Sequence, residues 1–191
     1  MNKFMNLIGI KARKAFEIKI NTKIKNKVLN NYAFLINKEK KSILRENKKD
    51  IKFAKNKGLK ENLINRLLVN EVKLKDIISS IQKISKLKDP VNNTLEKWSR
   101  PNGLNIKRVS IPIGVIGVIY ESRPNVTSDV AALCFKSGNA VILKGGSEAI
   151  NTNKILAKLF RNLTININTD SLIKLGQSIE IQLTNNEIFC L

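Results

Sequence analysis

The fold class is decided by residues 109–153, which read VSIPIGVIGVIYESRPNVTSDVAALCFKSGNAVILKGGSEAINTN. The apolar, β-branched run that ends at Ile119 predicts a strand that is apolar on both faces, as buried strands of parallel sheets are. Pro112 has no backbone N–H to donate, so we expect the buried strand to begin at Ile113. A second apolar run at 140–143 predicts a second strand.

The segments that follow these strands predict helices. Residues 127–129 have short polar side chains that cap helix N-termini, and they precede an apolar stretch at 130–136. Gly138, followed by Asn, is a typical helix end. Ser147 or a neighbour is expected to cap the next helix, over 148–161. The order strand, helix, strand, helix predicts a βαβα unit with a right-handed crossover and a parallel sheet.

Residues 3–88 predict helices that precede this unit. Apolar side chains recur there at steps of three and four, which is the period of a helix face packed on a core. The stripes are Tyr32, Leu35, Ile36, Ile43 and Leu44; Leu63, Ile64, Leu67 and Leu68; and Leu74, Ile77, Ile78, Ile81, Ile84 and Leu87. The pair at 89–90 (Asp-Pro) and the triplet at 101–103 (Pro-Asn-Gly) are turn signals.

The chain carries a net charge of +20, most of it in the first hundred residues. The lysines are scattered among acids and amides, without the aromatic side chains on which nucleic-acid bases stack. Arginine, the usual reader of base edges, is scarce. We interpret the charge as a solvated helical surface and expect no nucleic-acid partner, although a basic nucleic-acid-binding protein stays open as an alternative.

Cysteine and histidine content excludes several kinds of site. The chain has two cysteines, Cys134 and Cys190, and no histidine, so a Cys–His or Ser–His pair cannot form within it. No metal-ligand spacing is present. Cys134 lies on an apolar helix face and is expected to be an inert buried thiol. No apolar run reaches the roughly 18–20 residues that span a bilayer, and no secretory signal precedes the helices, so we expect a cytoplasmic protein. The basic start at Arg13 and Lys14 leaves a transit peptide open.

Two loops fall at the carboxyl ends of the predicted strands, where open parallel sheets bind ligands. Lys144 ends the second strand, and Gly145 and Gly146 remove side chains so that a ligand can approach. The next helix would point free N–H groups at the same place. However, neither GxGxxG nor a Walker A sequence is present. Spacing alone leaves two alternatives, a nucleotide site and a tight turn with a surface lysine.

The other loop, residues 121–127, contains side chains suited to anions. Arg123 is able to bind a phosphate or carboxylate in a fork geometry. Asn125 is able to donate an amide hydrogen to a developing oxyanion. A loop tethered by ordinary hydrogen bonds explains the same residues.

Residues 109–153 resemble γ-glutamyl phosphate reductase, also called glutamate-5-semialdehyde dehydrogenase, a family of the aldehyde dehydrogenase superfamily. The resemblance rests on IGVIYESRPNVT and KSGNAVILKGGSEA, and LEKWSRPNGLNIKRVSIPIG is similar in order to the family's N-terminal region. It implies that 1–100 is an N-terminal helical region packed on the cofactor domain. Residues 101–162 would begin a Rossmann-type, NADP-binding α/β domain, and 163–191 would be a divergent tail.

The resemblance also implies an activity and its residues. NADPH would reduce L-glutamyl 5-phosphate to L-glutamate 5-semialdehyde with release of phosphate, a step of proline biosynthesis, in a homo-oligomer. Residues that would surround the cofactor are Lys144, Gly145, Gly146, Ser147 and Glu148. Candidates for the substrate or active-site loop are Ser122, Arg123 and Asn125.

One part of the family's machinery has no counterpart in the sequence. By the resemblance, the family's nucleophilic cysteine would lie far downstream of the lysine loop, beyond residue 191, and we expect the catalytic domain to be absent from these residues. We therefore expect a truncated α/β fold without catalytic residues and without activity of its own. A non-catalytic nucleotide-binding or subunit-interaction module is the main alternative.

Overall fold

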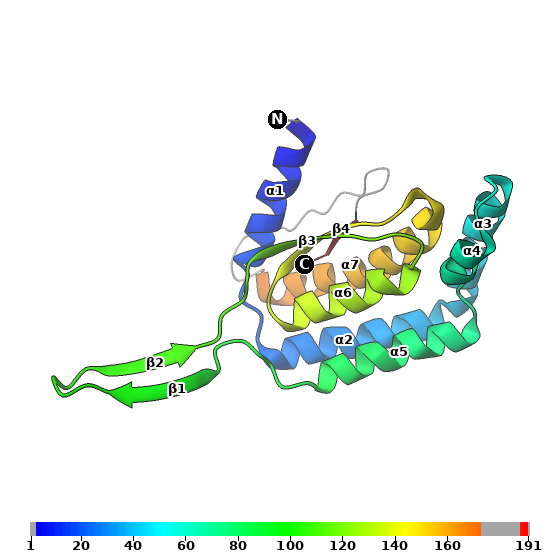
Figure 1. Cartoon of the computed structure of the whole chain (residues 1–191). Coiled ribbons are helices and arrows are strands. Elements are labelled where there is room, and N and C mark those ends of the chain that lie inside the picture. Colours follow the sequence, from blue (N-terminus) through cyan, green and yellow to red (C-terminus); the bar gives the residue numbers. More distant parts are fainter. Residues whose placement is uncertain (1–2, 173–187, 191) are drawn as a thin grey trace.

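The computed structural model describes residues 3–172 and 188–190 (Figure 1). Helices occupy the N-terminal part, as predicted for residues 3–88: α1 (Lys3–Phe16), α2 (Thr22–Lys38), α3 (Lys40–Asn56), α4 (Glu61–Leu67) and α5 (Glu71–Lys86). Strands and helices then alternate: β1 (Thr94–Ser99), β2 (Asn105–Val109), β3 (Val115–Ile119), α6 (Pro124–Lys136), β4 (Ala140–Lys144), the 3-10 turn η1 (Ser147–Ala149), α7 (Ile150–Leu172) and β5 (Ile188–Cys190).

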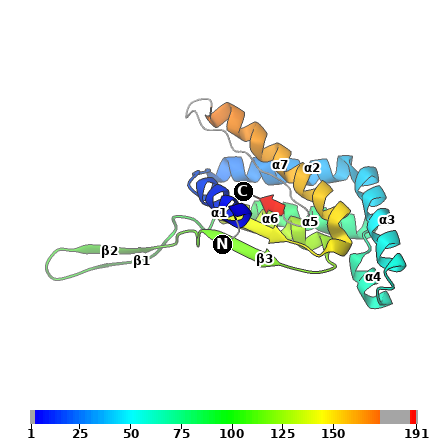
Figure 2. The same ribbon diagram turned by 90° about the horizontal axis from the view of Figure 1, so that it is seen from above.

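The long helices α2 and α5 begin at asparagine caps. The Asn21 side chain accepts a hydrogen bond from the Ile24 backbone N–H, and Asn70 accepts one from Lys73, each at 2.9 Å. These caps satisfy amide donors that have no partner within the helix. The two helices lie side by side beneath α6 (Figures 1 and 2).

The predicted βαβα unit is present. Strands β3 and β4 are parallel, with Val115 opposite Ala140 and Ile119 opposite Lys144, and α6 connects them. On the other edge of β4 lies β5, which is antiparallel and comes from the segment predicted as a divergent tail. The structure therefore has the α/β fold class that the sequence predicts.

Strands β1 and β2 form an antiparallel hairpin that projects away from the helices and the sheet (Figures 1 and 2). Its turn contains Gly103, whose φ of 84° suits glycine. The sequence did not predict β1, because its residues are polar and charged as well as apolar, and all of them are exposed. The predicted boundary at residue 100 falls within this hairpin.

The larger of two core clusters in the described residues joins the N-terminal helices to the α/β unit. The rings of Tyr32 in α2 and Phe160 in α7 pack edge to face with centroids 4.9 Å apart, and Phe135 of α6 meets Phe160 at 5.5 Å. The Tyr32 hydroxyl exchanges a hydrogen bond with Ser128 Oγ at 2.9 Å and donates to the Leu156 carbonyl at 3.2 Å. Contact between segments so far apart in sequence means that α2, α6 and α7 support one another.

The prediction that β3 begins at Ile113 and is buried on both faces is wrong. Gly114 has a φ of 128°, which interrupts an extended strand, and its N–H donates to the Asn139 side chain. The strand begins at Val115 and pairs only with β4 among the described residues. Ile113 and Ile119 are 85% and 80% exposed.

Both predicted helix starts also differ from the structure. Helix α6 begins at Pro124, so residues 127–129 lie within its first two turns and do not cap it. Proline is favoured at the first helical position because it has no N–H to leave unpaired. The helix expected over 148–161 begins with the 3-10 turn η1 and continues as α7 to Leu172. Within the described part of the chain, no helix combines the length and apolarity needed to cross a membrane.

Candidate functional site

The two predicted loops meet at the carboxyl ends of β3 and β4. Ile119 and Lys144 are register partners, and the Tyr120 N–H donates to the Lys144 carbonyl at 3.0 Å, so both chains leave the sheet together. The loops at 121–123 and 144–148 are therefore neighbours in space. This is the edge at which open α/β sheets bind ligands.

Glu148 ties these two loops to each other. Its Oε1 accepts hydrogen bonds from the Ser122 backbone N–H at 2.8 Å and from the Ser122 hydroxyl at 3.0 Å. Ser122 is buried and has a φ of 43°, a left-handed conformation that is uncommon for residues other than glycine. The Glu148 carboxylate thus stabilises the strained turn at Ser122. Glu148, which was predicted to bind the cofactor, therefore has a structural role as well.

Lys144, Arg123 and Ser147 are exposed around this junction. No described residue forms an ion pair with the side chain of Lys144 or Arg123. Two cations at the end of parallel strands, neither of them within ion-pair distance of a described carboxylate, are suited to a phosphate-bearing ligand.

The two glycines after Lys144 make room for protein atoms. A Cβ on Gly145 would collide with the Asn153 amide and lie 3.2 Å from the Tyr120 ring, and a Cβ on Gly146 would collide with the Glu148 carboxylate. The interpretation that both glycines clear space for a ligand therefore needs correction. They let the loop close onto Asn153 and Glu148.

Gly145→Ala is expected to lower the free energy of unfolding by about 1–3 kcal/mol, because the new methyl overpacks the contact with Asn153. Gly117→Ala is the matched control, since a Cβ on that exposed strand glycine meets nothing within 4 Å. Urea unfolding of both variants measures the difference. Equal stabilities would show that the loop does not close as described.

Asp50 occupies the N-terminus of α7, which corrects in part the expectation that the N–H groups of this helix are free to bind an anion. Asp50 of α3 accepts hydrogen bonds from the Asn151 and Thr152 backbone N–H groups at 3.1 and 2.8 Å. It also accepts from the Asn151 amide at 2.8 Å and the Thr152 hydroxyl at 2.6 Å. A buried carboxylate thus occupies the positive end of the helix dipole.

The first turn of α6 contains Asn125, which the sequence places in a loop. Its amide Nδ2 donates to Asp129 Oδ2 at 3.2 Å, one turn later. Sequence reasoning treated Asp129 only as a cap, and missed Asp50, Tyr120 and Asn153. Pro124, which is favoured at the first position of a helix, was the signal that could have corrected the role predicted for Asp129. No local pattern in the sequence marks Asp50, Tyr120 or Asn153.

Cys134 is buried, as predicted. Its side chain is 7% exposed, and burial raises the pKa of the thiol, so little nucleophilic thiolate forms at neutral pH. Cys190 ends β5, and its side chain lies outside the part that the structure describes. Among the described residues, no group of three or more His, Cys, Asp or Glu side chains is placed to hold a metal ion.

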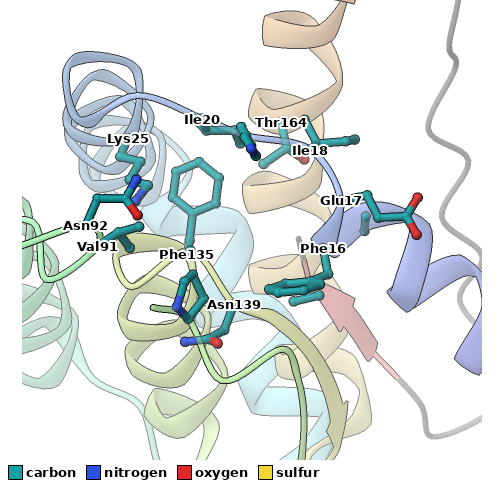
Figure 3. Close-up of a pocket in the computed structure, with 15 residues that line it drawn as sticks. Phe16, Glu17, Ile18, Ile20, Lys25, Val91, Asn92, Phe135, Asn139 and Thr164 are labelled. Atoms are coloured by element: carbon teal, nitrogen blue, oxygen red, sulfur yellow. The ribbon is translucent and has the colours of Figure 1, made fainter. Parts of the chain in front are cut away.

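A cavity of about 440 Å³ lies at the opposite end of β4 (Figure 3). Its walls are mainly apolar and include Phe16, Ile18, Ile20, Val91, Pro112 and Phe135. Lys25 lies in the wall, 3.0 Å from Asp89, which neutralises it. The cavity adjoins Ala140 rather than Lys144, so it is separate from the junction of the two loops.

The sequence is similar to curated proteins of one family. It is 44% identical over 167 residues to a γ-glutamyl phosphate reductase of Clostridium tetani, covering 86% of this chain and 39% of that protein. It is 50% identical over 142 residues to one of Hydrogenobaculum, covering 74% of this chain and 32% of the relative. The chain is homologous to the N-terminal part of γ-glutamyl phosphate reductases. It spans about two fifths of the length of the first of these relatives. No family model matches the sequence.

Solved structures support the same relationship. The γ-glutamyl phosphate reductase of Thermotoga maritima superposes with a TM-score of 0.77 at 40% identity, over 80% of this chain and 37% of that one. The γ-glutamyl phosphate reductase of Saccharomyces cerevisiae superposes with a TM-score of 0.84 at 32% identity, over 96% of this chain and 47% of that one. An aldehyde dehydrogenase of Bacillus subtilis superposes with a TM-score of 0.62 over 85% of this chain and 34% of that one. Because its identity is only 17%, this match shows the fold alone. The fold is therefore that of the N-terminal part of an aldehyde dehydrogenase-like protein.

Proposed function

We propose that the chain supplies the cofactor-binding part of an NADPH-dependent reductase. The reaction would convert L-glutamyl 5-phosphate to L-glutamate 5-semialdehyde with release of phosphate. The observation that carries this proposal is the junction of the loops at 121–123 and 144–148, where Lys144 and Arg123 form no ion pair with a described residue. The names of the relatives support the same reaction class.

The residues at this junction fit a nicotinamide nucleotide with a phosphate on its adenosine ribose. Lys144 offers an exposed ammonium group for that phosphate. Glu148 uses Oε1 on Ser122, and its Oε2 accepts no hydrogen bond from any described residue, so it is available to a ribose hydroxyl. Gly145 and Gly146 hold the turn that brings these groups together. When bound, the cofactor would supply the hydride.

Arg123, Ser122 and Asn125 would face the reacting end of the ligands. Arg123 is exposed with no ion pair in the described residues, which suits a phosphate group. Asn125 retains amide capacity beyond its bond to Asp129 and would donate to the oxygen that gains charge during reduction. Ser122, whose N–H and hydroxyl bind Glu148, would position the loop.

Lys144→Ala is expected to weaken NADPH binding roughly tenfold or more, because it removes a charge-assisted contact to phosphate. NADH binding should change little, so the preference for NADPH falls. Fluorescence titration of the 191-residue chain measures both affinities. Lys158→Ala, which changes an exposed lysine of α7, is the control. Equal effects of the two variants would count against the proposed phosphate contact.

We further propose that the chain alone binds NADPH without turnover. Of the chain's two cysteines, Cys134 is buried with a raised pKa, and the side chain of Cys190 lies outside the part that the structure describes. Incubation with NADPH and L-glutamyl 5-phosphate is therefore expected to leave the NADPH absorbance unchanged. Sustained oxidation dependent on the acyl phosphate would contradict this proposal, and binding without oxidation also fits a non-catalytic nucleotide-binding module.

A further inference from the structure

A directed chain of hydrogen bonds lies beside the loop at 144–148. The Thr127 hydroxyl donates to Asn153 Oδ1 at 3.0 Å, and the hydroxyl oxygens of Tyr120 and Thr127 are 2.5 Å apart. A hydroxyl has one hydrogen, and Thr127 gives it to Asn153, so Tyr120 is the donor to Thr127. The three side chains come from the end of β3, from the start of α6 and from the start of α7, so the chain of hydrogen bonds joins all three elements.

Two members of this chain lie against Gly145, the residue that follows Lys144. A Cβ on Gly145 would lie 2.3 Å from the Asn153 amide nitrogen and 3.2 Å from the Tyr120 hydroxyl oxygen. The Tyr120 backbone N–H also donates to the Lys144 carbonyl at 3.0 Å. The backbone at Lys144 is therefore held by Tyr120, and the backbone after it lies against the Asn153 amide.

The orientation of the Asn153 amide depends on Thr127. Thr127 is 0% exposed and Asn153 is 2% exposed, so both side chains are shielded from water. Among the described residues, Thr127 is the donor that the structure gives to Asn153 Oδ1. A buried carbonyl oxygen without a donor costs free energy, so the amide would turn toward another donor if the hydroxyl were removed. Because the amide nitrogen lies against Gly145, that rotation would displace Gly145 and Lys144.

We infer that Thr127 is a positioning residue that determines cofactor specificity. Its hydroxyl holds the Asn153 amide against Gly145, and Asn153 in turn sets the position of the Lys144 ammonium group. Thr127 acts through these residues and does not touch the ligand. The inference rests on the proposed function, because it concerns the preference of that same site for the phosphate of NADPH. It also gives a role to Thr127, which the sequence presents as a helix cap and which lies inside α6.

Thr127→Val replaces the hydroxyl with a methyl group and keeps the branched shape. In the 191-residue chain it is expected to weaken NADPH binding roughly threefold to tenfold, the range that one hydrogen bond covers, and to change NADH affinity little. Thr127→Ser keeps the hydroxyl and should retain the preference for NADPH. Fluorescence titration measures both affinities. A loss of stability alone would reduce the binding of both nucleotides equally, so their ratio separates positioning from packing.

Thr164→Val is the matched control, because it makes the same change at another buried threonine. Thr164 lies on α7, its hydroxyl donates to the Arg161 carbonyl at 2.9 Å, and it lines the cavity at the opposite end of β4. This variant should keep the preference for NADPH.

Asn153→Ala removes the amide itself and should lower the preference at least as far as Thr127→Val. Because Thr127 acts through Asn153, adding Thr127→Val to Asn153→Ala should lower the preference no further. This double variant distinguishes a positioning chain from two independent contributions.

Three results would overturn the inference: a preference for NADPH that survives Thr127→Val, an equal loss in Thr127→Ser or Thr164→Val, or effects that multiply in the double variant. In each of these cases the unsubstituted chain still prefers NADPH, so the proposed function stands. An unsubstituted chain that binds NADPH no better than NADH contradicts the phosphate contact of Lys144, and the inference falls with it.

Discussion

Asp50→Ala is expected to lower the free energy of unfolding by about 3–5 kcal/mol, a large effect for one substitution. The buried carboxylate accepts four hydrogen bonds from Asn151 and Thr152, and alanine would leave those donors without a partner. Because α7 follows the loop at 144–148 directly, loss of its cap should also disturb the cofactor junction. Urea unfolding measures the first effect, and NADPH affinity measures the second.

Glu46→Ala is the control for that substitution, since it lies on the same helix. Glu46 forms an ion pair with the exposed Lys49 at 2.8 Å, a kind of pair that contributes at most about 1 kcal/mol. Asp50→Ala should therefore cost several times more than Glu46→Ala. Similar losses in the two variants would mean that Asp50 does not cap α7.

Phe160→Ala is expected to cost about 3–5 kcal/mol as well, but for a different reason. The ring is 1% exposed and packs edge to face on both Tyr32 and Phe135, so its removal opens a cavity where α2, α6 and α7 meet. The transition should stay cooperative, because the helices and the α/β unit share this core. Thermal or urea unfolding followed by circular dichroism measures both properties.

Phe34→Ala serves as the comparison for Phe160. Its ring is 64% exposed on α2, so its removal should change the stability by less than about 0.5 kcal/mol. If Phe160→Ala were equally mild, or if it produced two separate unfolding transitions, the shared core would be contradicted.

The sequence predicts the elements whose residues are periodic and contiguous. The apolar stripes gave the N-terminal helices, and the runs ending at Ile119 and Leu143 gave the two parallel strands. Strand β1 was not predicted, because all its residues are exposed and the sequence therefore shows no apolar face that would mark a strand. Exposure of Ile113 and Ile119 depends on what pairs with and covers β3, which a local pattern does not contain.

Residues of the candidate site could be predicted only where they directly follow a strand that the sequence reveals. Lys144 at the end of a strand and the loop at 121–123 were found from the order of elements. Asp50 lies 101 residues before Asn151 along the chain, so its cap on α7 is visible only in three dimensions. The prediction that Gly145 leaves room for a ligand was wrong because Asn153, which lies eight residues later, occupies the space beside it.

Mapping NADPH on the 191-residue chain by two-dimensional NMR tests the central claim most directly. If the junction of β3 and β4 is the cofactor site, saturating NADPH should shift the amide signals of residues 144–148 and of Ser122 and Arg123. The exposed lysine-rich faces of α2 and α3 should shift little at physiological salt. Shifts confined to those faces, or none at all in a folded chain, would contradict the account.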